Sequence, residues 1–276
     1  MNRLILTRLC AVGAVCGLLA ISAGCASSGS TIPKGVTTEA DKFLYDKGTE
    51  ALNKKKWMKA REYFRQLVDN YPQSQYRPDA KVGLGDTYLG ENTLEALILA
   101  VNEYREFLTF YPTSRRADYA QYKLGYAHFA QMLAAQRDQT QTREAVKEFE
   151  TFVERYPNSS LMPEARKKLR ETQDRLSDSD YQVGYFYYRS RWYPGAVERF
   201  RAVLKTDPGY SNRDALYYFL ADAYVKMNRK AEAVPLVDRL IKEFEKSEYL
   251  EKAKKLMVDL QSAEAAPEAK AQKKRP

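Results

Sequence analysis

The chain has 276 residues, of which 45 are Lys or Arg and 36 are Asp or Glu, so its formal net charge is +9. All three cysteines lie within the first 25 residues, and His128 is the single histidine. The sequence beyond residue 25 therefore offers no thiol for disulfides, cysteine-based metal sites or nucleophilic catalysis. It is long enough to build its own hydrophobic core without such cross-links.

The first 24 residues have the layout of an export signal. Two arginines precede an apolar run over residues 9–23, which is shorter than the roughly 20 apolar residues of a membrane span. The run ends in Ala23, Gly24 and Cys25, and a pair of small residues before a cysteine resembles the lipobox of bacterial lipoproteins. We expect residues 1–24 to be a lipoprotein signal peptide and Cys25 to carry a lipid anchor. An ordinary signal peptide or a membrane-spanning helix is the alternative.

The next segment, residues 25–37, is rich in Ser, Gly and Thr and has no helical period. Such a composition is typical of a flexible linker. We therefore expect the lipidated cysteine and a tether over residues 25–37, with the folded part beginning at residue 38.

From residue 38 onward one pattern recurs five times: a small residue, then Ala, then an aromatic or apolar residue, a further apolar residue and, in four copies, Pro. A repeat of this kind predicts an array of helical hairpins, in which Pro ends the second helix because it cannot continue the hydrogen-bond ladder. The order resembles the tetratricopeptide repeat, although the Trp near the start of that repeat is absent. We predict an all-α fold, a right-handed solenoid of five tetratricopeptide-type hairpins. The copies open with Gly48, Gly85, Gly125, Gly184 and Ala221.

The spacing changes between the third and fourth repeats. The segment from Pro157 to Gly184 exceeds the segment from Pro72 to Gly85 by about four helical turns. We predict one long helix over residues 161–189, with a break near residues 177–180 as the alternative. The chain then divides into repeats 1–3 (38–160) and repeats 4–5 with the long helix and a capping helix (161–262). Residues 263–276 are basic and read as a disordered tail.

The sequence gives little support to enzyme chemistry. His128 falls in a column where other repeats carry Tyr, so packing is its expected role, and a metal site lacks its usual second His or Cys ligands. No Gly-rich phosphate loop is present, so we expect no cofactor. Charges of both signs alternate along most helices, which favours solvated faces over a nucleic-acid surface. The expectation is a binding scaffold with no metal, cofactor or nucleic acid.

A candidate ligand surface follows from the first helix of each repeat. In a tetratricopeptide stack, the positions three residues before and one residue after the small residue face the concave groove. Tyrosine there would offer an apolar ring and a hydroxyl to an extended polypeptide. Packing between layers is the alternative role for these rings. The groove candidates are Tyr45, Thr49, Asp86, Tyr122, Tyr126, Tyr181 and Tyr185.

Beyond the generic repeats, residues 156–233 resemble the outer membrane protein assembly factor BamD (ComL) family, and the lipobox, tether, five repeats and total size agree with that family over nearly the whole chain. The resemblance implies a protein anchored by lipid on the periplasmic face of the outer membrane. It also implies that repeats 1–3 receive unfolded outer membrane proteins, and that repeats 4 and 5 bind a BamA-like barrel protein, alongside other assembly lipoproteins. Arg199 aligns with an arginine of the BamA contact, a solvated helix charge being the alternative. The segments that carry the resemblance are 156–159, 174–176, 187–188, 213–216 and 223–224.

Two other functions fit parts of the same pattern. A tetratricopeptide lipoprotein could instead be an adaptor for a secretin, a pilus or a cell-wall synthesis complex, and the identity of co-purifying proteins would distinguish that role. A peptidoglycan-modifying hydrolase would need an acidic pair in a cleft, and turnover of purified sacculi would reveal it.

Overall fold

The computed structural model describes residues 39–272, which form eleven helices and no strand. The expected signal peptide, Cys25 and the whole tether lie outside the described residues, as do residues 273–276. The helices are α1 (Ala40–Asn53), α2 (Trp57–Asn70), α3 (Arg77–Glu91), α4 (Leu94–Phe110), α5 (Ala117–Phe129), α6 (Thr140–Arg155), α7 (Met162–Arg189), α8 (Tyr193–Thr206), α9 (Arg213–Lys226), α10 (Lys230–Glu243) and α11 (Leu250–Gln272).

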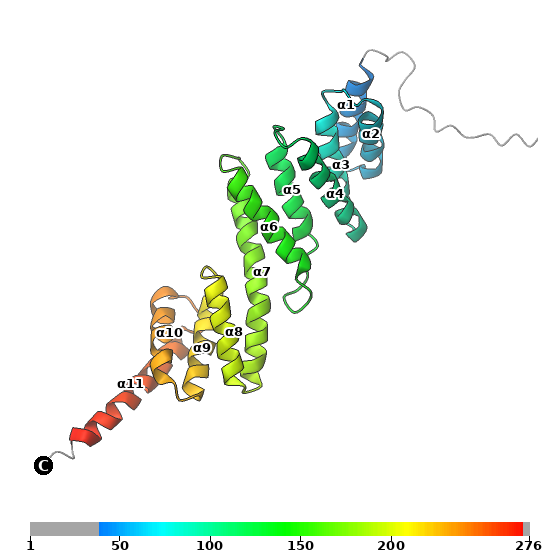
Figure 1. Cartoon of the computed structure of the whole chain (residues 1–276). Coiled ribbons are helices and arrows are strands. Elements are labelled where there is room, and N and C mark those ends of the chain that lie inside the picture. The colour runs from blue at the N-terminus through cyan, green and yellow to red at the C-terminus, as the bar shows by residue number, and fades with distance from the viewer. Residues whose placement is uncertain (1–38, 273–276) are drawn as a thin grey trace, which may run out of the picture.

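Consecutive helices pair into hairpins, and the hairpins stack into an elongated body (Figure 1). Helices α1, α3, α5, α7 and α9 are the first helices of the five repeats, and each packs against the helix that follows it. Helix α11 packs on α10 and covers the last hairpin. The structure therefore confirms the all-α solenoid of five hairpins with a capping helix.

The small residue that opens each repeat lets its two helices approach closely. Gly48, Gly85, Gly125 and Gly184 each lie against an aromatic ring of the following helix, where a side chain could not fit. A Cβ atom on Gly85, for example, would stand 2.6 Å from a ring carbon of Tyr104. The fifth repeat has Ala221 instead, and its hairpin partner in the core is the smaller Val237. A small residue on the first helix is thus paired with a large side chain on the second, so that the volume between the two helices is filled.

Helix α7 is unbroken from Met162 to Arg189, so the single long helix is confirmed and the break near residues 177–180 is wrong. The capping-type residue Ser177 is buried, and its hydroxyl donates a hydrogen bond to Asp207 at 2.6 Å instead of capping a helix. The first half of α7 runs beside α6 and its second half beside α8, so this one helix joins the third repeat to the fourth (Figure 1).

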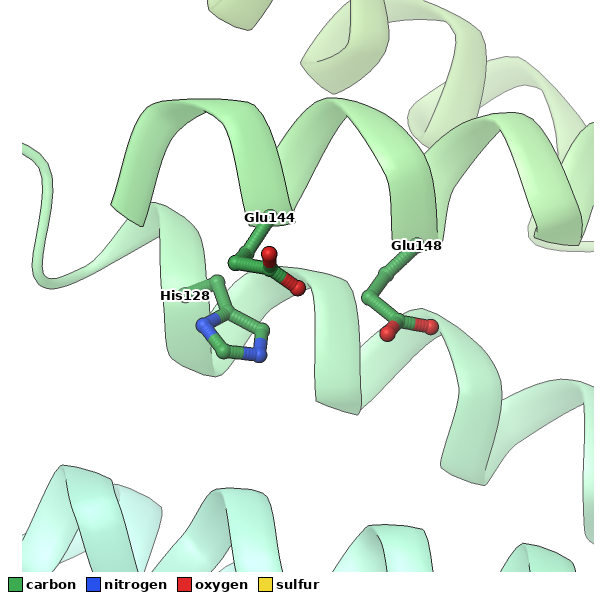
Figure 2. A group of neighbouring side chains, drawn as sticks. All are labelled: His128, Glu144 and Glu148. Carbon is green, nitrogen blue, oxygen red and sulfur yellow. The ribbon is translucent and has the colours of Figure 1, made fainter. Parts of the chain in front are cut away.

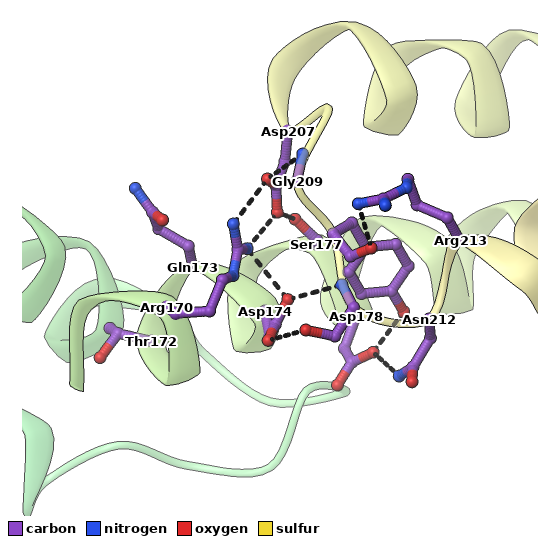
Figure 3. Close-up of polar contacts among 12 residues, drawn as sticks. Arg170, Thr172, Gln173, Asp174, Ser177, Asp178, Asp207, Gly209, Asn212 and Arg213 are labelled. Atoms are coloured by element: carbon purple, nitrogen blue, oxygen red, sulfur yellow. Dashed lines mark hydrogen bonds and ion pairs between the residues drawn. The ribbon is translucent and has the colours of Figure 1, made fainter. Parts of the chain in front are cut away.

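A polar network holds the middle of α7 to the turn between α8 and α9 (Figure 3). The Arg170 guanidinium pairs with Asp207, and Asp174 accepts hydrogen bonds from the amide and hydroxyl of Ser211 at 2.9 and 2.6 Å. Asp178 accepts the hydroxyl of Tyr210. Asp174, in the segment 174–176 that carried the family resemblance, is therefore part of the joint between α7 and the α8–α9 turn.

The contact between Asp174 and Ser211 repeats along the chain. In each case a serine in the turn after the second helix donates its hydroxyl, at 2.6 Å, to an aspartate near the start of the same repeat's first helix or, in α7, to its equivalent in mid-helix. The bond closes four of the five repeats at the end of their second helix, whereas in the second repeat Asp79 pairs with Arg115 instead. The pairs are Ser74 with Asp41, Ser159 with Asp118, Ser211 with Asp174 and Ser247 with Asp214.

The last helix is longer than the sequence suggested. Helix α11 runs from Leu250 to Gln272, whereas the capping helix was expected to end at residue 262, with disorder from 263. The expectation of disorder is thus wrong for the backbone of residues 263–272. Ala, Glu, Lys and Gln, which make up most of this segment, are strong helix formers, and the preceding turns supply the nucleus from which the helix extends.

Candidate functional site

The largest concentration of predicted site residues lies in a groove over the first three repeats. It has a volume of about 560 Å³ and opens between the α1–α2 turn, α3, α5 and the start of α7. We call it the amino-terminal groove. Three of the seven sequence candidates line it. Its lining residues are Leu52, Asn53, Lys55, Trp57, Asp86, Leu89, Gly90, Tyr119, Tyr122, Lys123, Tyr126, Leu161 and Glu164.

Tyr122 forms part of the floor of this groove. Its ring is only 4 % exposed and packs against Phe149 and Phe152 of α6, with ring centroids 6.0 and 6.1 Å away. Its hydroxyl donates to Glu164 of α7 at 2.7 Å. Burial, followed by this hydrogen bond, raises the pKa of the Tyr122 hydroxyl above its usual range. Tyr122 therefore supports the groove and ties α5 to α7, and its hydroxyl already has a partner.

Asp86 is likewise engaged within the protein. It accepts hydrogen bonds from the hydroxyls of Tyr104 at 2.6 Å and Tyr119 at 3.0 Å, and the Arg116 guanidinium lies 3.9 Å away. Burial raises the pKa of Asp86, and the tyrosine hydrogen bonds oppose that rise. The carboxyl thus holds α3, α4 and α5 together at the edge of the groove.

The walls of the groove combine aromatic rings with lysines. The Lys123 ammonium lies 5.3 Å from the ring centre of Tyr119 and 5.7 Å from that of Tyr126. Tyr126 is half-buried and stacks on Phe129. Trp57 closes the opposite side, where its indole packs on Gly90. Such a surface suits a ligand with apolar side chains and negative or polar groups.

Sequence reasoning missed Trp57, although a tryptophan at the start of a second helix, one of two in the chain, was a visible signal. It also grouped residues that the structure separates. Tyr45 stacks on Tyr76, with ring centroids 5.1 Å apart, and neither Tyr45 nor Thr49 lines the amino-terminal groove. Both are half-buried on α1.

The remaining tyrosine candidates lie in the second half of the molecule. Tyr181 stacks on Tyr185 and Tyr185 on Tyr188, with interplanar angles of 12° in both pairs. Tyr185 also packs edge-on against Phe219 of α9, at 4.9 Å between ring centres. Tyr181 borders a separate pocket of about 540 Å³ between the α5–α6 connection, α7, the start of α9 and the α10–α11 turn. The expected single stripe is therefore divided between two hollows, with packing as the main role of Tyr185.

Arg199 lies on α8 with its side chain exposed. It forms no hydrogen bond or ion pair with another described residue, so its guanidinium is free for an external partner. Its Cβ atom packs beside Gly184 of α7, which fixes the base of the side chain. The structure thus presents Arg199 as an accessible charge on the fourth repeat.

The sequence profile of the YfiO family, described as outer membrane lipoprotein, matches residues 37–235 of this chain. The chain belongs to this family. Among curated relatives, the outer membrane protein assembly factor BamD of Caulobacter vibrioides is 27 % identical over 76 % of this chain and 68 % of that protein. BamD of Vibrio cholerae is 29 % identical over 70 % of this chain and 82 % of that protein. The YfiO match covers all the residues of the amino-terminal groove and Arg199.

Solved structures similar to this YfiO-family chain include the TPR2AB domain of yeast Sti1 in complex with an Hsp90 peptide. It is 12 % identical, covers 81 % of this chain and 83 % of that one, and has a TM-score of 0.44. The assignment of the fold rests on the helices of this chain and not on that similarity. Within residues 39–272, no helix is both long and apolar enough to cross a bilayer.

Proposed function

We propose that this YfiO-family protein is a non-enzymatic lipoprotein scaffold of the outer membrane β-barrel assembly machinery. It would bind a BamA-like barrel protein and, in its amino-terminal groove, unfolded outer membrane proteins. The observation that carries the proposal is this groove, which is lined by rings and lysines and whose acidic side chains, Asp86 and Glu164, are engaged by tyrosines. The assembly-factor names of the curated relatives support the same role.

An unfolded polypeptide presents apolar side chains together with unpaired backbone groups. Trp57, Tyr119 and Tyr126 would contact the apolar side chains, because aromatic rings bury a large area at low entropic cost. The Lys123 ammonium would pair with a backbone carbonyl or a carboxylate of the substrate. Such a site favours extended segments without demanding one sequence.

The partner-binding side is expected on repeats 4 and 5. Arg199 is exposed there without an internal partner, and the long helix α7 connects this part of the molecule to the groove. Because α7 is continuous and tied to the α8–α9 turn, a partner bound on α8 would be held at a fixed position relative to the substrate. Cys25 would fasten the whole protein to the periplasmic face of the outer membrane.

The proposal is tested by placing a photoreactive residue at Tyr126, at Arg199 and at the exposed control position Glu154 in the native organism. Tyr126 should cross-link to unfolded outer membrane proteins, Arg199 to the barrel protein, and Glu154 to neither. Depletion of the protein should lower the level of outer membrane barrels. Unaffected barrel levels, or cross-links mainly to a secretin or to cell-wall enzymes, would overturn the proposal.

A further inference from the structure

A histidine and two glutamates converge between the helices of the third repeat (Figure 2). His128 lies in the last turn of α5, and Glu144 and Glu148 lie one turn apart on the facing side of α6. One ligand-type atom from each of the three side chains lies within 4.8 Å of the others. The i, i+4 spacing places both carboxylates on one face of α6.

The imidazole of His128 is buried, being only 5 % exposed. Its Nδ1 atom lies 2.7 Å from the amide oxygen Oε1 of Gln141. Since an amide oxygen only accepts, Nδ1 carries a hydrogen, and in a neutral ring Nε2 then keeps a lone pair that can bind a metal. Nε2 is buried and has no hydrogen-bond partner. A buried polar atom without a partner is uncommon in a folded protein and calls for a physical explanation.

Neither carboxylate forms the hydrogen bond that Nε2 lacks. Glu148 accepts a hydrogen bond from Gln121 at 2.7 Å on Oε2, and Glu144 forms no hydrogen bond or ion pair with any described residue. Neither glutamate is paired with a Lys or Arg in the described part of the chain. Two carboxylates and the unpartnered Nε2 atom thus share one space between α5 and α6.

We propose that this cluster binds one divalent transition-metal ion of the Zn²⁺ type. Its ligands would be His128 Nε2 and one carboxylate oxygen each from Glu144 and Glu148, with water completing the coordination. Imidazole together with carboxylate oxygens is a ligand set that suits Zn²⁺. The contacts of Gln141 with the imidazole and of Gln121 with Glu148 are the outer hydrogen bonds that orient ligands at metal sites.

The site explains a departure from the repeat pattern. At the position of His128 the second, fourth and fifth repeats carry Tyr88, Tyr187 and Tyr224. The third repeat also has the longest connection between its two helices, residues 130–139. A metal ion would fasten α5 to α6 across this long connection. Because α5 also carries Tyr119, Lys123 and Tyr126, it would steady one wall of the amino-terminal groove.

Metal binding is tested on purified, full-length protein without a polyhistidine tag, after treatment with chelator. Titration with Zn²⁺ in a calorimeter should give one site per chain with micromolar or tighter affinity. Zn²⁺ at 100-fold excess over its Kd should raise the midpoint of thermal unfolding by about 5 °C or more. Mg²⁺ and Ca²⁺ at the same concentration should have no such effect.

Because His128 is the only histidine in the chain, its ring nitrogens give a unique NMR signal. Zn²⁺ should shift the Nε2 resonance of His128 and leave Nδ1 protonated. Adventitious binding at surface carboxylates would leave both resonances in place, and that outcome would overturn the proposal even if calorimetry detected heat. This readout is independent of the proposed role in barrel assembly.

Glu144→Gln and His128→Gln should each weaken Zn²⁺ binding by at least about 10-fold. Glu154→Gln on the same helix is the matched control and should bind like wild type, because Glu154 is exposed and lies outside the cluster. Glu144→Gln removes no internal contact, so its far-UV circular dichroism should be unchanged. Absence of Zn²⁺ binding by wild type, or unchanged binding by both ligand variants, would show that His128 only packs.

Discussion

Arg170 and Asp207 form a two-pronged ion pair between the first half of α7 and the end of α8 (Figure 3). Nη1 of Arg170 donates to Oδ1 at 3.0 Å, and Nη2 donates to the other carboxylate oxygen. The hydroxyl of Ser177 also donates to that oxygen. Asp207 therefore holds two points of the long helix, two turns apart, at the end of α8, and so fixes the angle between α7 and α8.

Asp207→Ala should lower the free energy of unfolding by about 2 kcal/mol, since it leaves a partly buried guanidinium with Asp174 alone and the Ser177 hydroxyl without its acceptor. The matched control is Asp238→Ala, which removes an exposed i, i+4 pair with Lys242 and should cost less than about 0.5 kcal/mol. Urea titration followed by circular dichroism measures both. Equal losses for the two variants would contradict a structural role of the joint.

The same carboxyl should make stability depend on pH. Burial alone would raise the pKa of Asp207, but hydrogen bonds from Arg170 and Ser177 lower it below its ordinary value. A lowered folded-state pKa contributes stability above the unfolded pKa of about 3.9, and this contribution is lost as the pH falls through the folded pKa. The stability difference between wild type and Asp207→Asn should thus be constant from pH 7 to 5 and shrink below about pH 4. A difference that grew toward low pH would refute it.

Gly184→Ala tests whether the small residue on the first helix of a repeat is matched in volume to the large side chain on the second helix. Alanine normally stabilises a helix by about 1 kcal/mol over glycine. Here a Cβ atom would stand 2.8 Å from two ring carbons of Phe200, so we expect a loss of about 1–3 kcal/mol instead. Adding Phe200→Val reproduces the Ala221 and Val237 pair of the fifth repeat. The double variant should be more stable than the sum of the single losses by about 1 kcal/mol. Strict additivity would argue against direct contact.

The repeat pattern predicted those elements whose packing depends on one residue type at an equivalent position in each repeat. The small residue that opens each repeat predicted the hairpins, because the close approach of two helices leaves no room for a larger side chain. The absence of helix-breaking residues in the middle of α7 predicted the single long helix. The continuation of α11 to Gln272 was not predicted, because the prediction for this segment rested on its composition alone. It did not include the tendency of a helix that has already formed to extend along the chain.

The site was predictable only in part, for a geometric reason. Sequence position identifies which face of a helix a residue occupies, but not what the neighbouring helix places opposite it. Tyr122 and Tyr126 are one turn apart on the same face, yet Phe149 and Phe152 bury the first and leave the second half-exposed. The approach of His128 to the glutamates of α6 likewise depends on the pairing of two helices across a long loop.

Trp57 should report substrate binding directly. The chain has two tryptophans, and the other, Trp192, lies at the α7–α8 turn and does not line the groove. In a Trp192→Phe variant, an unfolded outer membrane protein segment should shift the remaining emission to shorter wavelength as the indole is covered. Trp57→Ala should weaken binding by about 10-fold, as expected for an aromatic anchor. An unchanged Trp57 spectrum at saturation would place the substrate elsewhere.

Arg199→Glu should weaken binding to the periplasmic domains of the BamA-like partner by about 10-fold or more, because it reverses an exposed charge that has no internal partner. For the same reason the stability should change by no more than about 0.5 kcal/mol. Arg201→Glu is the matched control, an exposed arginine on the same helix. Binding is measured by surface plasmon resonance at two salt concentrations. If both variants lose affinity equally, and the loss vanishes at high salt, then general charge attraction rather than a contact at Arg199 explains the association.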